Sequence, residues 1–314
     1  MKSALAAALL AGAFPTLPAF SAVPPSSAEA ELSRGLAALP ETLLSAHHRA
    51  VARWGMGMYE TAADGFEAVL KAVPDQPAAL ANLAAVRLLQ HRPRQAAELL
   101  NRALARLPRS PRLLYLRARA ARALDDDARA VELLRAACAV DPRETGLSLS
   151  LAEALAAQGH PSEAEAELRR LLSADPEYGP ALFRLARLLD ARGERAESTR
   201  LLRRFSAADG RSAAKRCRYD EPVEPPLSAP EPGPNWVSVR VVRARKNRTA
   251  TVTAYVGRLV LRTEAGDAPV RLRVGDRGPL DALRVDWSDG THSYRVDVAT
   301  GQTVVVEEAA THVW

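Results

Sequence analysis

A fixed interval organises the middle of this chain. The same step of 34 residues separates four prolines: Pro74, Pro108, Pro142 and Pro176. Four alanines keep the same step: Ala62, Ala96, Ala130 and Ala164. Sequences that repeat at a fixed period of this length fold as stacks of similar units, because one unit alone cannot bury its apolar face. The interval therefore predicts a repeat array in this part of the chain.

Each period contains two stretches with the pattern of an amphipathic helix. Apolar residues recur there at spacings of three and four, which in the second period are Leu80, Leu83, Ala84, Val86 and Leu88, then Ala96, Leu99, Leu100, Ala103 and Leu104. His91-Arg92-Pro93 separates the two stretches, and the proline at the end of the period stops the second one. The spacing predicts a hairpin of two helices in every period.

The order of small and large residues resembles the tetratricopeptide repeat family, whose pattern has a small residue at position 8, Ala at 20, a large apolar residue at 24 and Pro at 32. Position 24 is filled by Phe66, Leu100, Leu134, Leu168 and Leu202. Four periods fit this pattern, 43–76, 77–110, 111–144 and 145–178, and 179–210 is a degenerate fifth. The resemblance implies stacked hairpins whose first helices line a concave groove, and a protein that binds other proteins.

An arginine-rich groove follows from this arrangement. One helix face carries Arg112, Tyr115, Arg119 and Arg122, and the matching places hold Phe183, Arg184 and Arg187 in the fifth period and Asn82 in the second. We predict that these eight residues hold an acidic, partly apolar peptide. The alternative is that the arginines only solvate a helix face. Gly146 and Ser150 stand where the family members that grip a C-terminal carboxylate have a Lys/Asn/Arg clamp.

The first 28 residues have the pattern of an export signal. Met1-Lys2 supplies a positive charge, Ser3–Ala13 is a short apolar run, and prolines and small residues follow. Cleavage after Ser21 or after Ala28 suits this pattern, which predicts a periplasmic or secreted protein. A disordered, Ala-rich leader of a cytoplasmic protein is the alternative. The apolar run is too short to span a bilayer, and no later segment reaches spanning length without a charge, so no transmembrane segment is predicted.

The net charge of the chain bears on which class of molecule it binds. The formal net charge is +6 and the isoelectric point is about 9.7, which in a cytoplasmic protein would favour nucleic acid. Export, and the acidic residues interspersed among the arginines, argue against nucleic acid. The predicted partners are therefore a protein or an acidic peptide, with peripheral association with an anionic envelope surface as a further expectation.

The composition changes after residue 210. Residues 211–234 are dense in proline and have the pattern of an extended, semi-rigid tether. Residues 235–314 are rich in Val and Thr, and their apolar side chains alternate, with turn residues between the runs and a hairpin predicted at Ser288-Asp289-Gly290. The predicted fold class is α + β in separate domains, with a helical solenoid over 29–210 and a small antiparallel β sandwich or barrel of about six or seven strands after the tether.

The β segment resembles the ASPIC/UnbV domain family. Trp287-Ser288-Asp289-Gly290 and Val304–Glu307 match its turn and last strand, and Asn235-Trp236 and Asn247-Arg248 match its opening strand and first turn. Ser288 stands where the family has Pro, and Val274-Gly275-Asp276 replaces a Phe-Gly-Leu-Gly segment. The resemblance implies an exported protein and supplies no catalytic residue.

The sequence carries no motif of an enzyme. It has no Gly-x-Ser-x-Gly elbow, His-Glu-x-x-His helix, phosphate-binding glycine loop or dinucleotide fingerprint. Two cysteines cannot form a zinc site without histidine partners, and the six histidines show no ligand spacing. No enzymatic activity, cofactor or metal is therefore predicted.

Several polar residues have local interpretations. His47 and His48 are expected on the surface, and the acidic triplet Asp125–Asp127 is expected to cap a helix. Cys138 is expected as a buried free thiol, with a disulfide to Cys217 as the alternative. Asp286 and Asp289 are expected in solvent, and the alternative is that they bind a cation or a sugar.

These patterns together favour an exported, non-enzymatic scaffold whose helical groove holds a partner. Two alternatives stay open at this point. The β domain could bind a carbohydrate or a metal while the array recruits or oligomerises, or the chain could be an accessory subunit of an exported enzyme complex.

Overall fold

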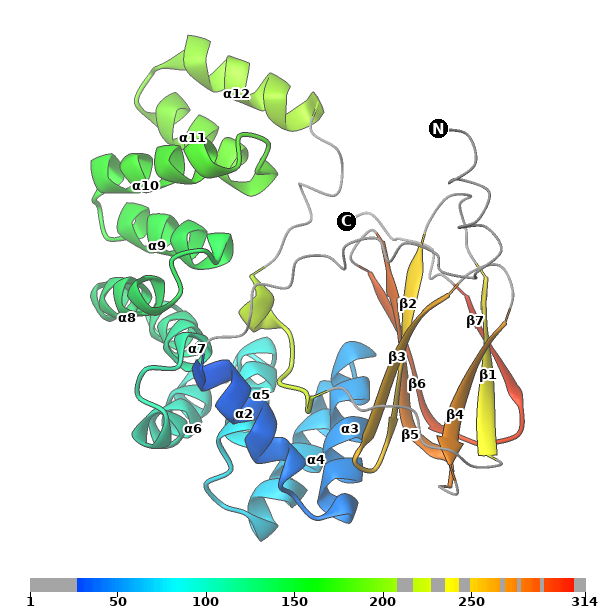
Figure 1. Ribbon diagram of the computed structural model, residues 1–314. Coiled ribbons are helices and arrows are strands. Elements are labelled where there is room, and N and C mark those ends of the chain that lie inside the picture. The colour runs from blue at the N-terminus through cyan, green and yellow to red at the C-terminus, as the bar shows by residue number, and fades with distance from the viewer. Residues whose placement is uncertain are drawn as a thin grey trace, which may run out of the picture.

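The computed structural model describes residues 27–207, 217–226, 235–242, 249–265, 269–275, 278–288 and 291–307. All but the last two residues of the expected signal peptide lie outside these ranges, as do Asn247-Arg248 and Asp289-Gly290. Within them, the chain forms a curved row of helices that leads to a small β domain (Figure 1). This is the predicted fold class, an α-helical solenoid followed by a β domain.

The helices come in pairs that follow the period. Their bounds are α2 Ser27–Ala37, α3 Glu41–Gly55, α4 Tyr59–Ala72, α5 Pro77–Leu89, α6 Pro93–Arg106, α7 Pro111–Arg122, α8 Asp127–Val140, α9 Thr145–Ala157, α10 Pro161–Ala174, α11 Gly179–Ala191 and α12 Arg195–Ala207. The four prolines of the period lie two residues after the ends of α4, α6, α8 and α10. Proline lacks an amide hydrogen and crowds the preceding turn, so each of these helices ends where the sequence indicates.

Side-chain caps fix the starts of several helices. The Gln76 side chain accepts a hydrogen bond from the Ala79 amide (2.6 Å), and Ser110 accepts one from Leu113 (3.4 Å). Asp126 accepts one from the Arg129 amide (3.0 Å), which confirms that the acidic triplet caps a helix.

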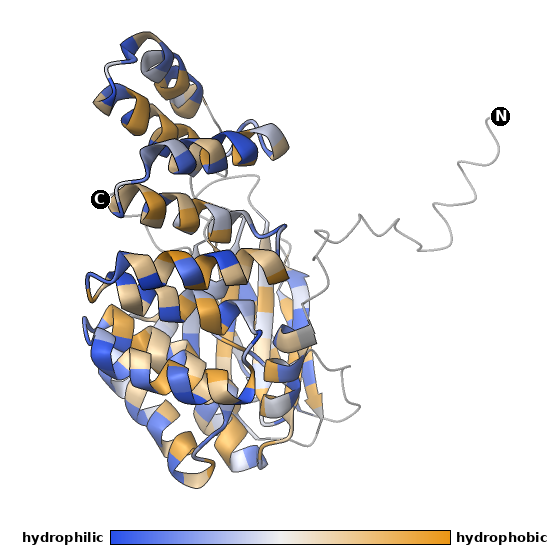
Figure 2. Cartoon of the chain, turned by 90° about the vertical axis from the view of Figure 1, so that its left-hand side faces the viewer, coloured by the Kyte–Doolittle hydropathy of each residue, from blue (hydrophilic) through white to orange (hydrophobic). Residues whose placement is uncertain are grey.

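The core of the array is built from the periodic positions. The four alanines of the period are fully buried, and each allows two helices to approach closely because its side chain is small. Figure 2 shows the result, with apolar and polar residues segregated on opposite sides of many helices. The last hairpin departs from this pattern, since Leu202 is 40% exposed whereas Leu134, at the same position two periods earlier, is 1% exposed. A terminal unit has no following hairpin to cover that side.

Two sheets form the β domain. The strands are β1 Asn235–Val242, β2 Ala250–Val256, β3 Leu259–Ala265, β4 Val270–Gly275, β5 Leu280–Trp287, β6 His292–Val298 and β7 Thr303–Glu307. One sheet has the order β4-β1-β7 and the other β3-β2-β5-β6. Strands β5 and β6 pair antiparallel on either side of the predicted hairpin turn. The inner faces of the two sheets share one apolar core that includes Val239, Val252, Leu283 and Val285.

One pair of strands is parallel, although the sequence predicts an antiparallel domain. Strand β7 runs parallel to β1, with Val239 beside Val304 and Val241 beside Val306. Five strands separate β1 from β7 along the chain. No tight turn therefore constrains these two strands to be antiparallel, as it does in a hairpin.

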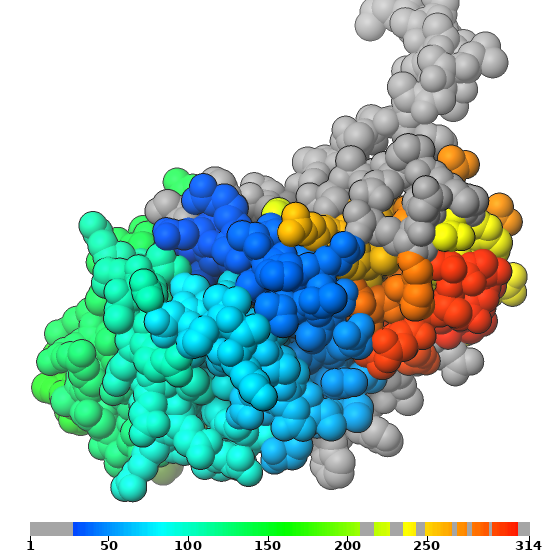
Figure 3. All heavy atoms as spheres, turned by 90° about the horizontal axis from the view of Figure 1, so that it is seen from below, coloured from blue at the N-terminus to red at the C-terminus, as the bar shows by residue number. Residues whose placement is uncertain are grey.

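The β domain packs directly on the first hairpin of the array. Helix α3 lies across the outer face of the sheet β3-β2-β5-β6, where Ala52 shares an apolar cluster with Tyr255, Val260, Ala282 and Tyr294. Figure 3 shows the first helices, in blue, directly beside the strands, in orange and red. The four-stranded sheet is thus covered on both faces, which explains why nearly every residue of β5 is buried.

Polar contacts reinforce this junction. Arg49 Nη1 of α3 donates to Asp281 Oδ1 (3.0 Å), and the Gly257 amide donates to Asp281 Oδ2 (2.7 Å). His48 Nδ1 lies 3.7 Å from the same carboxylate. The expectation of surface histidines is wrong, because His47 and His48 are both buried, His48 against Tyr255 and His47 against Phe66. The helix face that carries them is covered by the sheet and by the neighbouring helix.

Replacing Leu134 with Ala is expected to lower the free energy of unfolding by about 2–5 kcal/mol, because it leaves a cavity in the core of the array. Leu202→Ala removes the same atoms from the same position of the period, and should cost less than about 1 kcal/mol because that side chain already meets solvent. Thermal and denaturant unfolding measure both values. Equal losses would contradict the described packing.

Asp281→Asn is expected to weaken the junction in a pH-dependent way. Burial alone would raise the pKa of Asp281, but the contacts from His48, Gly257 and Ser45 outweigh it and hold the pKa below its ordinary value of 3.8. A carboxylate of this kind stabilises the fold fully above pH 3.8 and loses that effect as the pH falls through the lower folded pKa.

At pH 7, the free energy of unfolding should therefore fall by about 1–3 kcal/mol for Asp281→Asn. Below pH 3.8, the free energies of unfolding of the unmodified protein and of Asp281→Asn should become equal. Asp64→Asn, at an exposed position of α4, is the matched control. A loss for Asp281→Asn that stays constant down to acidic pH would contradict the assignment.

Candidate functional site

The first helix of each hairpin faces the inside of the curve. We call the inner wall the face formed by α5, α7, α9 and α11, which carries all eight predicted groove residues. A segment far along the chain, residues 217–226, lies against this wall, and we call it the strap. Figure 1 shows its short 3-10 turn, Arg218–Asp220, inside the curve of the helices. The groove is thus partly filled by the chain itself.

Asn82 binds the main chain of the strap. Its Nδ2 donates to the Val223 carbonyl (3.1 Å), and its Oδ1 accepts from the Val223 amide (2.8 Å). Asn82 Nδ2 also lies 2.9 Å from Nε2 of His47. Burial, with a smaller effect of His48, lowers the pKa of His47 to about 3. A neutral ring can accept a hydrogen bond from the amide, so His47 orients Asn82 toward the strap.

Arg112 connects three segments of the chain. Its side chain is buried, its Nε donates to Glu29 of α2 (2.9 Å), and its Nη1 donates to the carbonyls of Tyr219 (3.3 Å) and Glu221. Its guanidinium also lies over the Tyr219 ring, 5.2 Å from the centroid. Because Arg112 is buried among its partners, it does not serve merely to solvate a helix face.

Tyr115 and Arg119 bind the side chain of Asp220 in the strap. The Tyr115 hydroxyl donates to Asp220 Oδ1 (3.0 Å), and Arg119 Nη1 donates to the same oxygen (2.6 Å). Burial raises the pKa of Tyr115 above its ordinary value, and Asp220 adds to that shift. The tyrosine is thus a proton donor to a carboxylate at physiological pH.

The start of the strap is anchored by a second acidic group. The Tyr219 hydroxyl donates to Asp141 Oδ2 (2.6 Å), and Arg218 pairs with the same carboxylate. Cys217 is buried beside Gly146, where an added Cβ would lie 2.6 Å from the Cys217 Cα. Glycine at this position therefore makes room for the strap. Both cysteines are free thiols, and burial raises the pKa of Cys138 to about 11 and that of Cys217 further.

The end of the strap reaches the β domain. Arg284 of β5 is buried and pairs with Glu224 of the strap (3.1 Å). Asp286, one of the two acids proposed for a cation or a sugar, pairs with Arg284 and with His292 (2.6 Å). Burial alone would raise its pKa, but these partners hold the pKa of Asp286 below its usual value. Asp286 is therefore engaged by its own domain, and Asp289 lies outside the described residues.

The strap leaves the other four predicted groove residues uncovered. Arg122 and Arg184 pair with the two carboxylate oxygens of Glu153, at 3.2 and 2.7 Å. Phe183 is 36% exposed and stacks near Phe205, with 5.5 Å between ring centroids. Arg187 is exposed and forms no ion pair with the residues that the structure describes. The structure thus divides the eight residues into a covered group and an open group.

Sequence reasoning did not find the residues of the strap. Tyr219, Asp220 and Val223 belong to a segment that has the composition of a tether, and their contacts with the array span 78 to 141 residues of chain. One signal was present. Apolar side chains such as Tyr219 and Val223 are unusual in a solvated Pro/Glu linker, and both are buried.

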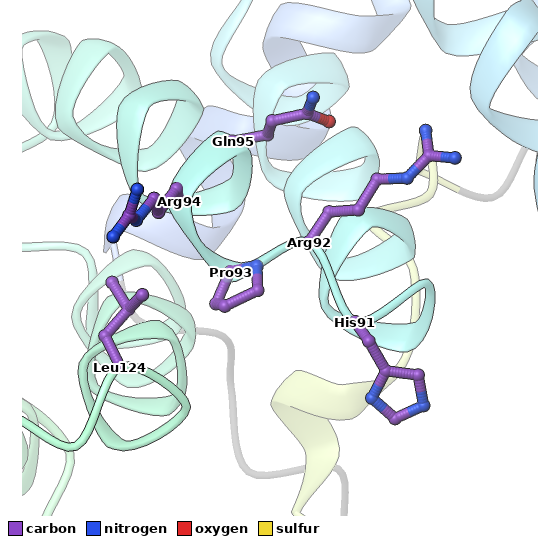
Figure 4. Close-up of a pocket in the computed structure, with 6 residues that line it drawn as sticks. All are labelled: His91, Arg92, Pro93, Arg94, Gln95 and Leu124. Atoms are coloured by element: carbon purple, nitrogen blue, oxygen red, sulfur yellow. The ribbon is translucent and has the colours of Figure 1, made fainter.

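A second candidate site is a shallow hollow at the α5–α6 and α7–α8 turns. It is lined by His91, Arg92, Pro93, Arg94, Gln95 and Leu124. Figure 4 shows that Arg92 and His91 point away from Leu124, so the side chains do not converge on one point. The hollow therefore has none of the convergent polar groups of the strap site.

Two models of the tetratricopeptide repeat match the chain, over residues 53–120 and 145–188. The chain contains tetratricopeptide repeats. These models match only the helical part, and the resemblance of the β domain to the ASPIC/UnbV family stays a prediction.

Solved structures with similar folds include MamA, at 19% identity, with 56% of this chain and 96% of that chain covered and a TM-score of 0.48. A tetratricopeptide repeat protein of Thermus thermophilus shows 25% identity, covers 54% and 98% of the two chains, and has a TM-score of 0.44. The pilF protein of Pseudomonas aeruginosa shows 19% identity, covers 59% and 81%, and has a TM-score of 0.47. No curated protein matches the chain.

Among the helices of the described residues, none has the length and apolar character needed to cross a membrane.

Asn82→Ala is expected to release the centre of the strap. It removes both hydrogen bonds to Val223, so hydrogen–deuterium exchange of the Val223 amide should accelerate by roughly tenfold, the factor that corresponds to about 1.4 kcal/mol. Asn101→Ala, at an exposed position of α6 where the side chain accepts from Arg117, is the control and should leave this amide unchanged. Equal exchange in both variants would show that Asn82 does not hold the strap.

Proposed function

We propose that the protein is an exported, non-enzymatic scaffold whose tetratricopeptide repeats hold a partner protein by an acidic, partly apolar peptide. The observation that carries this proposal is the strap. The inner wall already holds an extended, acid-bearing peptide through side chains that bind its main chain and its carboxylate. Repeats of this kind act as protein-binding scaffolds, and the contacts of the strap indicate which chemistry this wall accepts.

The open group of wall residues is the proposed entry point of the partner. Phe183 and Arg187 follow Tyr115 and Arg119 by 68 residues, which is two periods of 34. They therefore stand at the same positions of a first helix. Because Tyr115 and Arg119 bind the carboxylate of Asp220, the later pair offers a carboxylate of the partner an aromatic ring and a guanidinium that is not paired with any described acid. Arg184, shared with Glu153, borders this place.

Export and a periplasmic location belong to the same proposal. The sequence pattern before residue 27 supports them, and the start of the first described helix favours one of the two cleavage positions. Helix α2 begins at Ser27, and Glu29 pairs with the buried Arg112. Cleavage after Ser21 would leave α2 whole, whereas cleavage after Ala28 would remove its first two residues beside this ion pair. We therefore favour cleavage after Ser21.

A photoreactive amino acid at position 183 tests the open site. Crosslinking in cells of the source organism, followed by mass spectrometry, should capture one protein through an acidic segment, and Arg187→Glu should reduce the yield about tenfold, since charge-assisted hydrogen bonds contribute roughly 1.5–3 kcal/mol. The control places the same probe at Leu124, which is similarly exposed but lies at an outer turn. An identical set of products from both positions, or no effect of Arg187→Glu, would contradict the proposal.

A further inference from the structure

The contacts of the strap show which features of a bound peptide the wall recognises. Asn82 and Arg112 bind main-chain groups of the strap, as a groove does when it takes an extended peptide of any sequence. Within residues 219–223, the wall binds polar side-chain groups of the strap at two positions. Tyr115 and Arg119 select a carboxylate at position 220, and Asp141 selects a hydroxyl-bearing ring at position 219.

A third position is selected by shape. Val223 is buried and packs into the core of the array. Glu221 lies between these anchors, and its exposed side chain approaches Arg284 of β5 (3.7 Å) and, in the part of the chain that the structure describes, no residue of the wall. Pro222 is half-buried. The wall thus reads a short pattern, Tyr-Asp-x-x-Val, in which the two central residues are free to vary.

We propose that the wall between α5 and α9 is a binding site for a partner's peptide of the form Tyr-Asp-x-x-Val, and that the strap occupies this site in cis until the partner displaces it. The proposal rests on the proposed function, in that it names the sequence chemistry and the regulation of the same groove. The open pair Phe183 and Arg187 would receive the partner first.

The solvent exposure of the strap explains how such an exchange can begin. The ion pair between Arg119 and Asp220 is about one-third exposed on each side, at 37% and 31% of the two side chains. A competing carboxylate can therefore approach Arg119 without prior loss of the buried contacts. A partner already bound at Phe183 would do so at a high effective concentration, because the second contact is then intramolecular.

Occupation in cis also sets the affinity that a partner observes. A ligand that binds only the open state of the wall shows an apparent dissociation constant equal to the intrinsic one divided by the fraction of chains with the strap released. A strap that is seated in nine chains out of ten would thus weaken binding about tenfold. Release of the strap would raise the affinity without any change in the wall.

The buried thiol of Cys217 reports the state of the strap directly. In a full-length chain with Cys138→Ser, Cys217 is the one remaining cysteine of the sequence. Its reaction with a maleimide should be slow, and an excess of a synthetic peptide Arg-Tyr-Asp-Glu-Pro-Val-Glu, which copies residues 218–224, should accelerate it at least tenfold. A peptide with Asp replaced by Lys is the matched control and should have no effect. Labelling that proceeds only at the rate of global unfolding, with or without the peptide, would overturn the proposal.

A strap variant provides the second test. Asp220→Arg places a cation against Arg119 and should release the strap while the wall stays intact. We expect the fluorescent form of the same peptide to bind this variant at least tenfold more tightly than the unmodified chain, and Asn82→Ala added to it should abolish the gain. Circular dichroism and thermal unfolding establish that both variants are folded, and Asp220→Ala serves as a milder form of the same change.

The outcomes are distinguishable. Equal peptide binding by the unmodified chain and the folded Asp220→Arg variant would show that the strap does not compete for the site. Dimers of the unmodified chain in light scattering, dissolved by Asp220→Arg, would show that straps exchange between two copies, and would overturn the assignment to a separate partner. Crosslinking at position 183 does not depend on the strap. The proposed function can therefore fail in that experiment while the peptide still displaces the strap, and the displacement can fail while the crosslinking succeeds.

Discussion

The structure depends on how the main chain of the strap is satisfied inside the groove. Apart from its single 3-10 turn, this segment belongs to no helix or sheet, so its buried amides and carbonyls need partners from elsewhere. Asn82 and Arg112 supply them. Arg112 simultaneously holds Glu29 of α2, and the end of the strap pairs with Arg284 of the β domain. One short peptide therefore contacts the N-terminal helix, the array and the β domain, in addition to the direct packing of α3 on the sheet.

The repeat architecture could be predicted because its determinants are local. Proline and alanine at a step of 34 fix where helices end and which faces meet, and the same step placed the eight groove residues on the inner wall. The strap could not be predicted in this way. Asn82 and Val223 are 141 residues apart, and no periodic pattern links a side chain of α5 to a backbone amide in a Pro-rich segment. Whether the eight residues bind an external partner stays a prediction.

In the β domain, too, contacts between distant segments could not be predicted from the sequence. Alternation of apolar residues indicated the strands, but it assumes that one face of each strand meets solvent. Helix α3 covers the second face of β3-β2-β5-β6, and Tyr255 and Tyr294 are buried there together with His48. A pair of histidines in a helix is usually exposed because burial of an imidazole requires polar partners. Asn82 hydrogen-bonds to His47 here, and the Asp281 carboxylate lies 3.7 Å from His48. Both residues are far from the histidines in the sequence.

The chemistry of the strap favours a replaceable occupant over a permanent one. A segment meant to stay in place is held best by burial of apolar area, as the alanine and leucine core of the array is. The strap instead combines the buried side chains of Cys217, Tyr219 and Val223 with hydrogen bonds and ion pairs that reach the surface at Asp220. The partly exposed contacts at Asp220 contribute little net stability, because water or another ligand can satisfy the same groups. In the proposed exchange, the wall selects its occupant by sequence pattern more than by affinity, as a site shared between a cis segment and a partner requires.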